Sequence, residues 1–119
     1  MNVIITGGAG FIGSNFCCLK KNKFNKIIII DCLNYSGNIK NLENIVDNEK
    51  IQFIEKNIVN VNFEELFDKH NIDLIIHFAG QTHVDQSYKN LNSFIEDNIC
   101  ATCHILESLR KYEKKVKFI

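Results

Sequence analysis

The stretch TGGAGFIG, residues 6–13, constrains the fold of this chain more than any other part of the sequence. Its glycines fit two spacings, G-x-G-x-x-G through Gly8, Gly10 and Gly13, and G-x-x-G-x-x-G when counted from Gly7. One such glycine allows a tight turn, another a close approach of the backbone to a phosphate, and the last a close contact between helix and strand. An apolar run precedes the stretch and a helical pattern follows it. This context predicts a strand, a phosphate-binding turn and a helix in succession.

Short apolar runs recur along the chain at intervals that suit a parallel sheet. Continuous apolar runs of this length are typical of strands that are buried on both faces. Apolar residues at helical spacing lie between the runs, which indicates helices in the connections. The predicted strands are VIIT (3–6), KIIIID (26–31), IQFIE (51–55), DLIIHFA (73–79) and VKFI (116–119). The predicted helices carry Ile12, Phe16 and Leu19, then Phe63, Leu66 and Phe67, then Ile95, Ile99, Thr102, Leu106 and Leu109.

The alternation of strands and helices predicts an α/β fold, a Rossmann-like doubly wound parallel sheet with right-handed crossovers. A chain of 119 residues is expected to form one domain, here residues 1–119. The strand order should be 3-2-1-4-5, because the direction of winding reverses after the first unit. That reversal opens a crevice at the carboxyl ends of the strands, where such folds bind ligands.

Asp31 ends the second predicted strand, 18 residues after Gly13. In a dinucleotide-binding βαβ unit, an acid at this place accepts hydrogen bonds from the adenosine ribose hydroxyls. Its charge would also repel a 2′-phosphate, so the sequence favours NAD over NADP. The helix that follows the glycines would present free N–H groups to the pyrophosphate.

Composition excludes several other classes of function. The formal net charge is zero, whereas nucleic-acid binders carry clustered positive charge. No segment approaches the roughly 20 apolar residues of a membrane span, and the N-terminus lacks the features of a signal peptide. Five cysteines without framework spacing indicate free thiols in a reducing compartment. We therefore expect a cytoplasmic protein with neither a nucleic-acid nor a membrane partner.

TGGAGFIGSNF, DCLNYSGNIKNL and HFAGQTHVDQS are three blocks of the sequence that together resemble one family. It is the extended short-chain dehydrogenase/reductase family and, within it, the group of nucleotide-sugar 4,6-dehydratases. TGGAGFIGSNF is similar to the start of that family. DCLNYSGNIKNL, residues 31–42, resembles the segment D-x-L-T-Y-A-G-N-x-x-N-L, and HFAGQTHVDQS, residues 77–87, resembles H-x-A-A-[EQ]-[ST]-H-V-D-x-S. The likeness covers essentially the whole chain. It is strongest to the groups that act on dTDP-glucose, with those that act on UDP-glucose almost as close.

This resemblance implies a set of cofactor contacts, carried over position by position. The family binds NAD and a nucleotide sugar, and Thr82 and His83 would lie toward the sugar nucleotide. Asn57 stands where the family has an aspartate beside adenine, Gly80 replaces a common alanine, and Asp97 replaces a threonine. The implied NAD contacts are Gly7, Gly10, Phe11, Ile12, Gly13, Asp31, Cys32, Leu33, Asn34, Asn57, Ile58, Phe78, Ala79, Gly80, Gln81, Thr82 and Asp97.

The catalytic groups of the family are not found among these residues. Its reaction oxidises the sugar by hydride transfer to NAD, eliminates water and returns the hydride, which needs a Tyr-x-x-x-Lys pair and an Asp-Glu pair. The family places these groups after the fifth strand, where this sequence ends. Tyr35, Tyr88 and Tyr112 have no lysine four residues later. We therefore assign no catalytic residue and expect the chain to be inactive by itself.

Two other patterns have simpler interpretations than they first suggest. CATCH, residues 100–104, matches the C-x-x-C-H pattern of haem attachment, but it lies in a predicted amphipathic helix. His77, His83 and Asp85 match no familiar metal spacing, and His77 is better interpreted as a hydrogen-bonded histidine at a strand end. Cys17 and Cys18 are expected to be packing residues of a helix. The sequence therefore predicts no metal site.

Two functions from different classes remain open. The first is the NAD-binding N-terminal part of a dTDP-glucose or UDP-glucose 4,6-dehydratase of deoxysugar biosynthesis. The second is a non-catalytic module that binds a nucleotide or pairs with another chain. In either case the strand 116–119 would present an open edge, which invites self-association.

Overall fold

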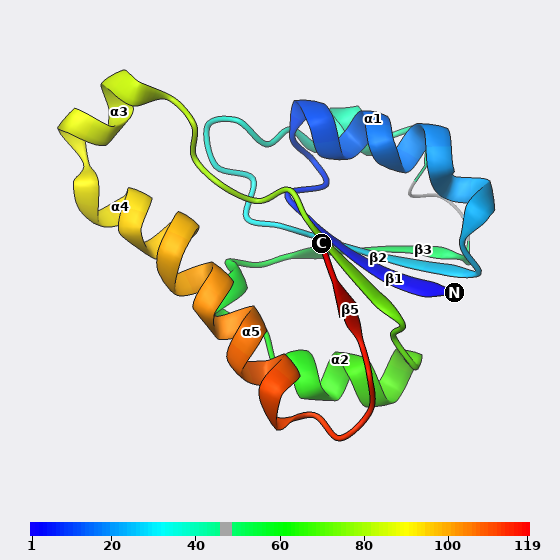
Figure 1. The fold of residues 1–119 in the computed structure, drawn as a ribbon. Helices are drawn as coiled ribbons and strands as arrows, with labels where there is room; N and C mark the ends of the chain where they lie inside the picture. The colour runs from blue at the N-terminus through cyan, green and yellow to red at the C-terminus, as the bar shows by residue number, and fades with distance from the viewer. Residues whose placement is uncertain (46–48) are drawn as a thin grey trace.

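The computed structural model describes residues 1–45 and 49–119, and shows one parallel sheet between two layers of helices (Figure 1). The strands are β1 (Asn2–Thr6), β2 (Lys26–Asp31), β3 (Ile51–Glu55), β4 (Leu74–His77) and β5 (Lys117–Phe118). They are hydrogen-bonded in the order β3-β2-β1-β4-β5, and every pairing is parallel. The predicted α/β fold and the predicted strand order are therefore confirmed.

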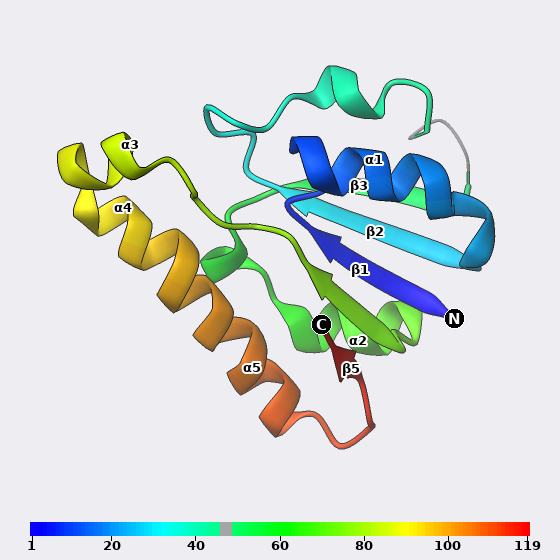
Figure 2. The ribbon, with the colours of Figure 1, turned by 45° about the horizontal axis from the view of Figure 1, so that its top comes forward.

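The helices lie in the connections between the strands, as predicted. The α-helices are α1 (Phe11–Lys20), α2 (Phe63–His70), α3 (Val84–Lys89), α4 (Leu91–Ile95) and α5 (Ala101–Lys111). A π-helical turn, η4 (Glu96–Cys100), joins α4 to α5. Short 3₁₀ turns are η1 (Lys21–Lys23), η2 (Ile39–Leu42) and η3 (Ile58–Asn60). Figure 2 shows α1 on one face of the sheet, and α2 and α5 on the other.

Alternating side chains of the central strands point into two separate cores. Val3, Ile5 and Ile29 pack on the side of α1, together with Cys17. Ile4, Ile28, Ile30 and Ile75 pack on the side of α2 and α5, against Phe63, Phe67 and Ile105. Because both faces are covered, the strands are apolar at nearly every position. This explains why their sequences read as continuous runs.

Helix α2 shows how local sequence sets the bounds of an element. The side chain of Asn62 caps its start by accepting a hydrogen bond from the Glu65 N–H at 3.2 Å. Asn71 ends it in the left-handed conformation, with φ at +47°. Phe63 and Phe67 of the predicted stripe are fully buried.

Helices α1 and α5 bury only part of the faces that their apolar residues indicated. Phe16 of α1 and Leu109 of α5 pack against the cores as predicted. In α1, however, Ile12 and Leu19 are exposed, while Gly13, Ser14 and Cys17 are buried. The close approach of α1 to the preceding turn requires glycine at position 13, where a Cβ would collide with the Gly7 carbonyl. The prediction for Cys17 is confirmed, and burial raises the pKa of its thiol to about 12. The prediction for Cys18 was wrong, because that side chain is exposed.

The inner face of α5 is formed by Ala101, Ile105 and Ser108, one position before the predicted stripe. Three members of that stripe, Ile95, Ile99 and Leu106, are exposed instead. The helix is apolar on two faces, so periodicity alone cannot select the buried one. None of the helices in the described ranges is long and apolar enough to cross a membrane.

Two neighbouring substitutions in α5 test this assignment. Ile105→Ala should lower the free energy of unfolding by about 2–5 kcal/mol, because it opens a cavity beside α2. Leu106→Ala should change it by less than about 0.5 kcal/mol, since Leu106 is 46% exposed. Urea unfolding followed by circular dichroism measures both. Equal losses would contradict the assigned face.

Candidate functional site

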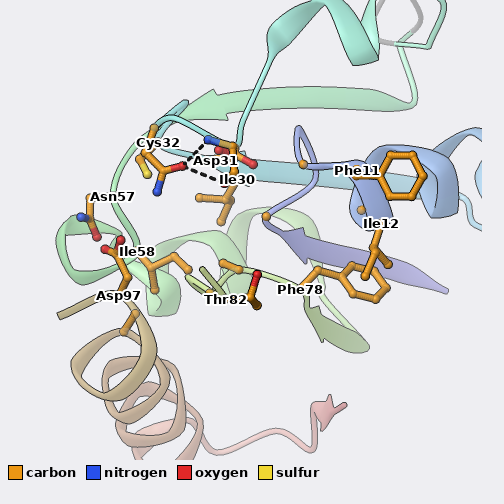
Figure 3. Close-up of a pocket in the computed structure, with 18 of the residues that line it drawn as sticks. Phe11, Ile12, Ile30, Asp31, Cys32, Asn57, Ile58, Phe78, Thr82 and Asp97 are labelled. Carbon is orange, nitrogen blue, oxygen red and sulfur yellow. Dashed lines mark hydrogen bonds between the residues drawn. The ribbon is translucent and has the colours of Figure 1, made fainter. Parts of the chain in front are cut away.

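A cavity of about 360 Å³ opens at the carboxyl ends of the strands. Its walls come from the turn between β1 and α1, the segments after β2, β3 and β4, and the π-turn η4 (Figure 3). This is the place where the winding of the sheet reverses, since β1 lies between β2 and β4. The crevice predicted from the strand order is therefore present.

The glycine turn meets two steric demands that no other residue satisfies. Gly7 has φ at +67°, and a Cβ there would lie 2.5 Å from the Ala79 N. A Cβ on Gly13 would lie 2.2 Å from the Gly7 carbonyl oxygen, so α1 can approach the turn only with glycine at this position. A Cβ on Gly10 would meet just one atom within 4 Å, the Gly7 oxygen at 3.3 Å. Gly10 thus leaves open space beside the helix start.

The N-terminus of α1 has no internal partner for its first N–H groups. Gly10 is the N-cap residue and supplies no side-chain hydrogen bond, and no acid lies in the first turn. Free N–H groups and the positive end of the helix dipole together favour an anion. Gly10, Phe11, Ile12 and Gly13 all line the cavity, so this anion-binding end faces it.

Asp31 is buried at the end of β2, where it joins two segments of the cavity wall. One carboxylate oxygen accepts a hydrogen bond from the Ala9 N–H at 2.9 Å, and the other accepts one from the Leu33 N–H at 2.9 Å. Gly37 lies so close that a Cβ added to it would be 2.7 Å from the Asp31 Oδ1 atom. Each oxygen keeps a lone pair, which can accept a hydrogen bond from a ligand hydroxyl.

The far end of the cavity combines charged and polar side chains. Cys32, Lys56, Asn57 and Asp97 line it, and Figure 3 shows Asp97 and Asn57 on facing elements. The Asn57 side chain accepts a hydrogen bond from the Val59 N–H at 3.2 Å, which caps η3. Burial raises the pKa of the Cys32 thiol, and the nearby carboxylates of Asp31 and Asp97 raise it further. The thiol is therefore neutral and a poor nucleophile near pH 7.

The segment after β4 is held by the π-turn. The Asn98 side chain accepts a hydrogen bond from the Gln81 N–H at 2.7 Å and donates one to the Gln81 carbonyl at 2.9 Å. The Gln81 amide also donates to Asp97 at 2.6 Å. Asn98 lies so close that a Cβ on Gly80 would be 3.2 Å from its side-chain oxygen, which favours glycine at this position.

Most of the residues proposed from the sequence come together around this cavity. It is lined by Gly7, Gly10, Phe11, Ile12, Gly13, Asp31, Cys32, Asn34, Asn57, Ile58, Phe78, Ala79, Gly80, Thr82, His83 and Asp97. Leu33 and Gln81 are not part of the lining. Leu33 packs against the core on the side of α1, and Gln81 is bound to the π-turn.

Four lining residues were not predicted, namely Ile30, Ser36, Lys56 and Ala101. Ile30 and Lys56 each precede a predicted contact, so extending the predicted segments by one residue would have included them. Ala101 lies one helical turn after Asp97, which its spacing could have indicated. The sequence carries no comparable signal for Ser36.

Two of the histidines, His77 and His104, form side-chain hydrogen bonds within the fold. His77 ends β4, where its Nδ1 lies 2.6 Å from the Thr6 hydroxyl and its Nε2 lies 3.1 Å from the Thr102 hydroxyl. His104 lies in α5, as predicted for CATCH, and its Nε2–H donates to the Val61 carbonyl at 2.8 Å. The ring of His83 contacts Tyr35, with 5.5 Å between centroids. Within residues 1–45 and 49–119, no three His, Cys, Asp or Glu side chains are placed to bind a metal.

A glycine turn before an uncapped helix, with a buried acid after the second strand, defines the dinucleotide-binding class of Rossmann folds. The chain belongs to the GDP-mannose 4,6 dehydratase family, which residues 4–119 match. The predicted resemblance to nucleotide-sugar 4,6-dehydratases is thus confirmed.

Curated relatives and solved structures agree with this assignment. The dTDP-D-glucose 4,6-dehydratase of Dictyostelium discoideum is 43% identical over 98% of this chain and 27% of its own length. A dTDP-glucose 4,6-dehydratase of Escherichia coli is 36% identical over 99% of this chain and 35% of its own length. The NAD complex of the Bacillus anthracis dTDP-glucose 4,6-dehydratase is 33% identical, with a TM-score of 0.83 over 99% of this chain and 36% of that one. The chain spans about a third of the length of such relatives.

Two glycine substitutions test the roles assigned to the turn. Gly13→Ala should lower the free energy of unfolding by about 1–3 kcal/mol or more, because the new Cβ would collide with backbone atoms that cannot move freely. Gly10→Ala should cost about 1 kcal/mol or less, since its Cβ meets one atom at a tight but tolerable distance. Thermal unfolding of the two variants gives the comparison. A larger loss for Gly10→Ala would mean that the close contact has been assigned to the wrong glycine.

The environment of His77 predicts how this ring titrates. Burial lowers its pKa from the ordinary value of 6.5, because the charged ring loses hydration. Because the pKa of His77 is lower in the folded than in the unfolded state, its contribution to the free energy of unfolding is fully present above about pH 6.5. This contribution is lost as the pH falls through the folded-state pKa of His77. Two-dimensional NMR should show the His77 ring titrating below 6.5 in the folded chain. The same ring in the urea-unfolded chain is the control, and equal values would contradict the prediction.

Proposed function

We propose that residues 1–119 form the NAD-binding part of a nucleotide-sugar 4,6-dehydratase that acts on dTDP-glucose. The observation that carries this proposal is the cavity between the glycine turn and Asp31, at the place where the sheet reverses its winding. The names of the curated relatives, which are dTDP-glucose 4,6-dehydratases, support the substrate. NAD in such an enzyme accepts a hydride from the sugar and returns it.

The residues of the cavity fit the chemical parts of NAD in turn. The open space at Gly10 and the free N–H groups of α1 suit the pyrophosphate. Asp31 is placed to accept hydrogen bonds from the adenosine ribose, and Ile58 offers an apolar surface for adenine. The segment from Phe78 to Thr82 would then follow the nicotinamide half, with His83 toward the sugar nucleotide.

The chain's own residues bind and orient in this proposal, and none of them performs the proton transfers. The charge at Asp31 excludes a 2′-phosphate, while α1 and Gly10 fix the position of the diphosphate. Hydrogen bonds that join Gln81 to Asn98 and Asp97 hold the segment that follows β4 in one position. The nicotinamide ring of bound NAD would therefore meet a fixed surface.

We also infer a cytoplasmic location and a capacity for self-association. All five cysteines are free, which supports a reducing compartment. Strand β5 is paired with β4 along one side, and a further strand from another chain could pair along the other.

Titration calorimetry with NAD and NADP tests the proposed cofactor. Wild-type chain should bind NAD more tightly, and Asp31→Asn should reduce this preference by about 1–3 kcal/mol, or roughly 5- to 150-fold. Asparagine keeps an oxygen for one of the two backbone N–H groups, so it perturbs the fold less than alanine would. The ratio of the two affinities is compared, because unfolding weakens binding of both cofactors alike.

Asp68→Asn is the matched control, since it removes the same charge from α2, where Asp68 contacts Tyr112 outside the cavity. It should leave the preference unchanged. If NAD and NADP lose affinity equally in Asp31→Asn, then Asp31 does not contact the ribose. If wild-type chain binds neither nucleotide, the proposed function is wrong for this chain.

A further inference from the structure

A line of hydrogen bonds passes through both ring nitrogens of His77, the residue just before the cavity-lining segment Phe78 to Gly80. On one side, Nδ1 lies 2.6 Å from the hydroxyl oxygen of Thr6, at the end of β1. On the other side, Nε2 lies 3.1 Å from the hydroxyl oxygen of Thr102, in α5. The Thr102 hydroxyl is also 2.9 Å from the backbone carbonyl of Asn98, in the π-turn. The imidazole thus connects two strands of the sheet to the helix that covers them.

The direction of each bond follows from the number of hydrogens available. A carbonyl can only accept, so the single Thr102 hydroxyl hydrogen goes to the Asn98 carbonyl. Thr102 can then only accept from His77, which places a hydrogen on Nε2. A neutral ring with hydrogen on Nε2 has a bare Nδ1, and Nδ1 accepts the hydroxyl hydrogen of Thr6. Burial, which lowers the pKa of His77, favours this neutral ring.

The two ends of this line are hydrogen-bonded to the same segment, from Ala79 to Gln81, in which Ala79 and Gly80 line the cavity. The Thr6 oxygen accepts a hydrogen bond from the Ala79 N–H, at 3.5 Å. At the other end, the side chain of Asn98 binds the backbone of Gln81 through two hydrogen bonds. Ala79 and Gln81 flank Gly80, so a break at the imidazole would loosen the wall from two directions.

We propose that His77 is a positioning residue, held as the Nε2–H tautomer, that fixes the segment from Ala79 to Gln81 against the bound dinucleotide. This inference rests on the proposed function for its consequence in binding. The tautomer and the rigidity of the segment follow from the hydrogen bonds alone. A residue that only filled space would need neither a defined tautomer nor a hydroxyl at position 102.

The substitutions Thr102→Val and Thr102→Ser separate hydrogen bonding from packing. Valine keeps nearly the shape of threonine but removes both the acceptor for His77 and the donor to Asn98. Serine keeps the hydroxyl. Ser108→Ala is the matched control, because it deletes another buried hydroxyl of the same helix that is not a hydrogen-bond partner of the His77 ring.

Three measurements on the whole chain decide the outcome. Nitrogen-15 NMR of the imidazole should show the Nε2–H tautomer in wild-type chain and in Thr102→Ser, and a mixture of tautomers in Thr102→Val. Amide hydrogen exchange at Gln81 should be about tenfold faster in Thr102→Val, and NAD should bind about tenfold more weakly, as expected for one lost hydrogen bond. Thr102→Ser and Ser108→Ala should stay within about twofold of wild type in both respects.

A charged ring or an Nδ1–H tautomer in wild-type chain at neutral pH would overturn the proposal. Equal exchange at Gln81 in Thr102→Val and wild type would overturn it as well. If wild-type chain fails to bind NAD, the proposed function is wrong, but the tautomer and the exchange rate still decide whether His77 positions the segment. Suppose that wild-type chain binds NAD and that Thr102→Val changes the tautomer and the exchange rate but binds NAD equally well. His77 then does not position the segment for the dinucleotide.

Discussion

The close approach of three backbone segments at the glycine turn is the constraint on which the rest of the structure depends. Gly7 lies against the backbone of Ala79, and Gly13 lies against the carbonyl of Gly7. These contacts bring the end of β1, the start of α1 and the segment after β4 to one point. Glycines at positions 7, 8 and 10 keep large side chains out of this turn, which leaves the first N–H groups of α1 accessible from the cavity.

The isoleucine-rich sheet makes this turn rigid. β1 and β2 are buried on both faces, and their side chains alternate between two cores. Burial of an isoleucine contributes about 1.5–3 kcal/mol, so the central strands supply much of the stabilisation. The polar groups of the site can therefore gather at the carboxyl ends of the strands while the cores remain apolar.

The fold could be predicted from the sequence because strand runs, glycine spacing and the position of Asp31 are all local signals. The buried faces of α1 and α5 could be predicted only in part, because the small residues Gly13, Cys17 and Ala101 are buried while larger apolar neighbours are exposed. Most of the residues that the resemblance implied as cofactor contacts line one cavity. The orientation of Gln81 depends on the π-turn, whose register no periodicity in the sequence revealed.

The two backbone bonds of Asp31 have a consequence for any attempt to redesign cofactor preference. The carboxylate that would distinguish the nucleotides also ties Ala9 to Leu33, so specificity and fold stability depend on the same atoms. Replacing the acid with a residue that welcomes a 2′-phosphate would leave the buried N–H of Ala9 without its acceptor. A change of nucleotide preference at this position would thus also require a new acceptor for the Ala9 N–H.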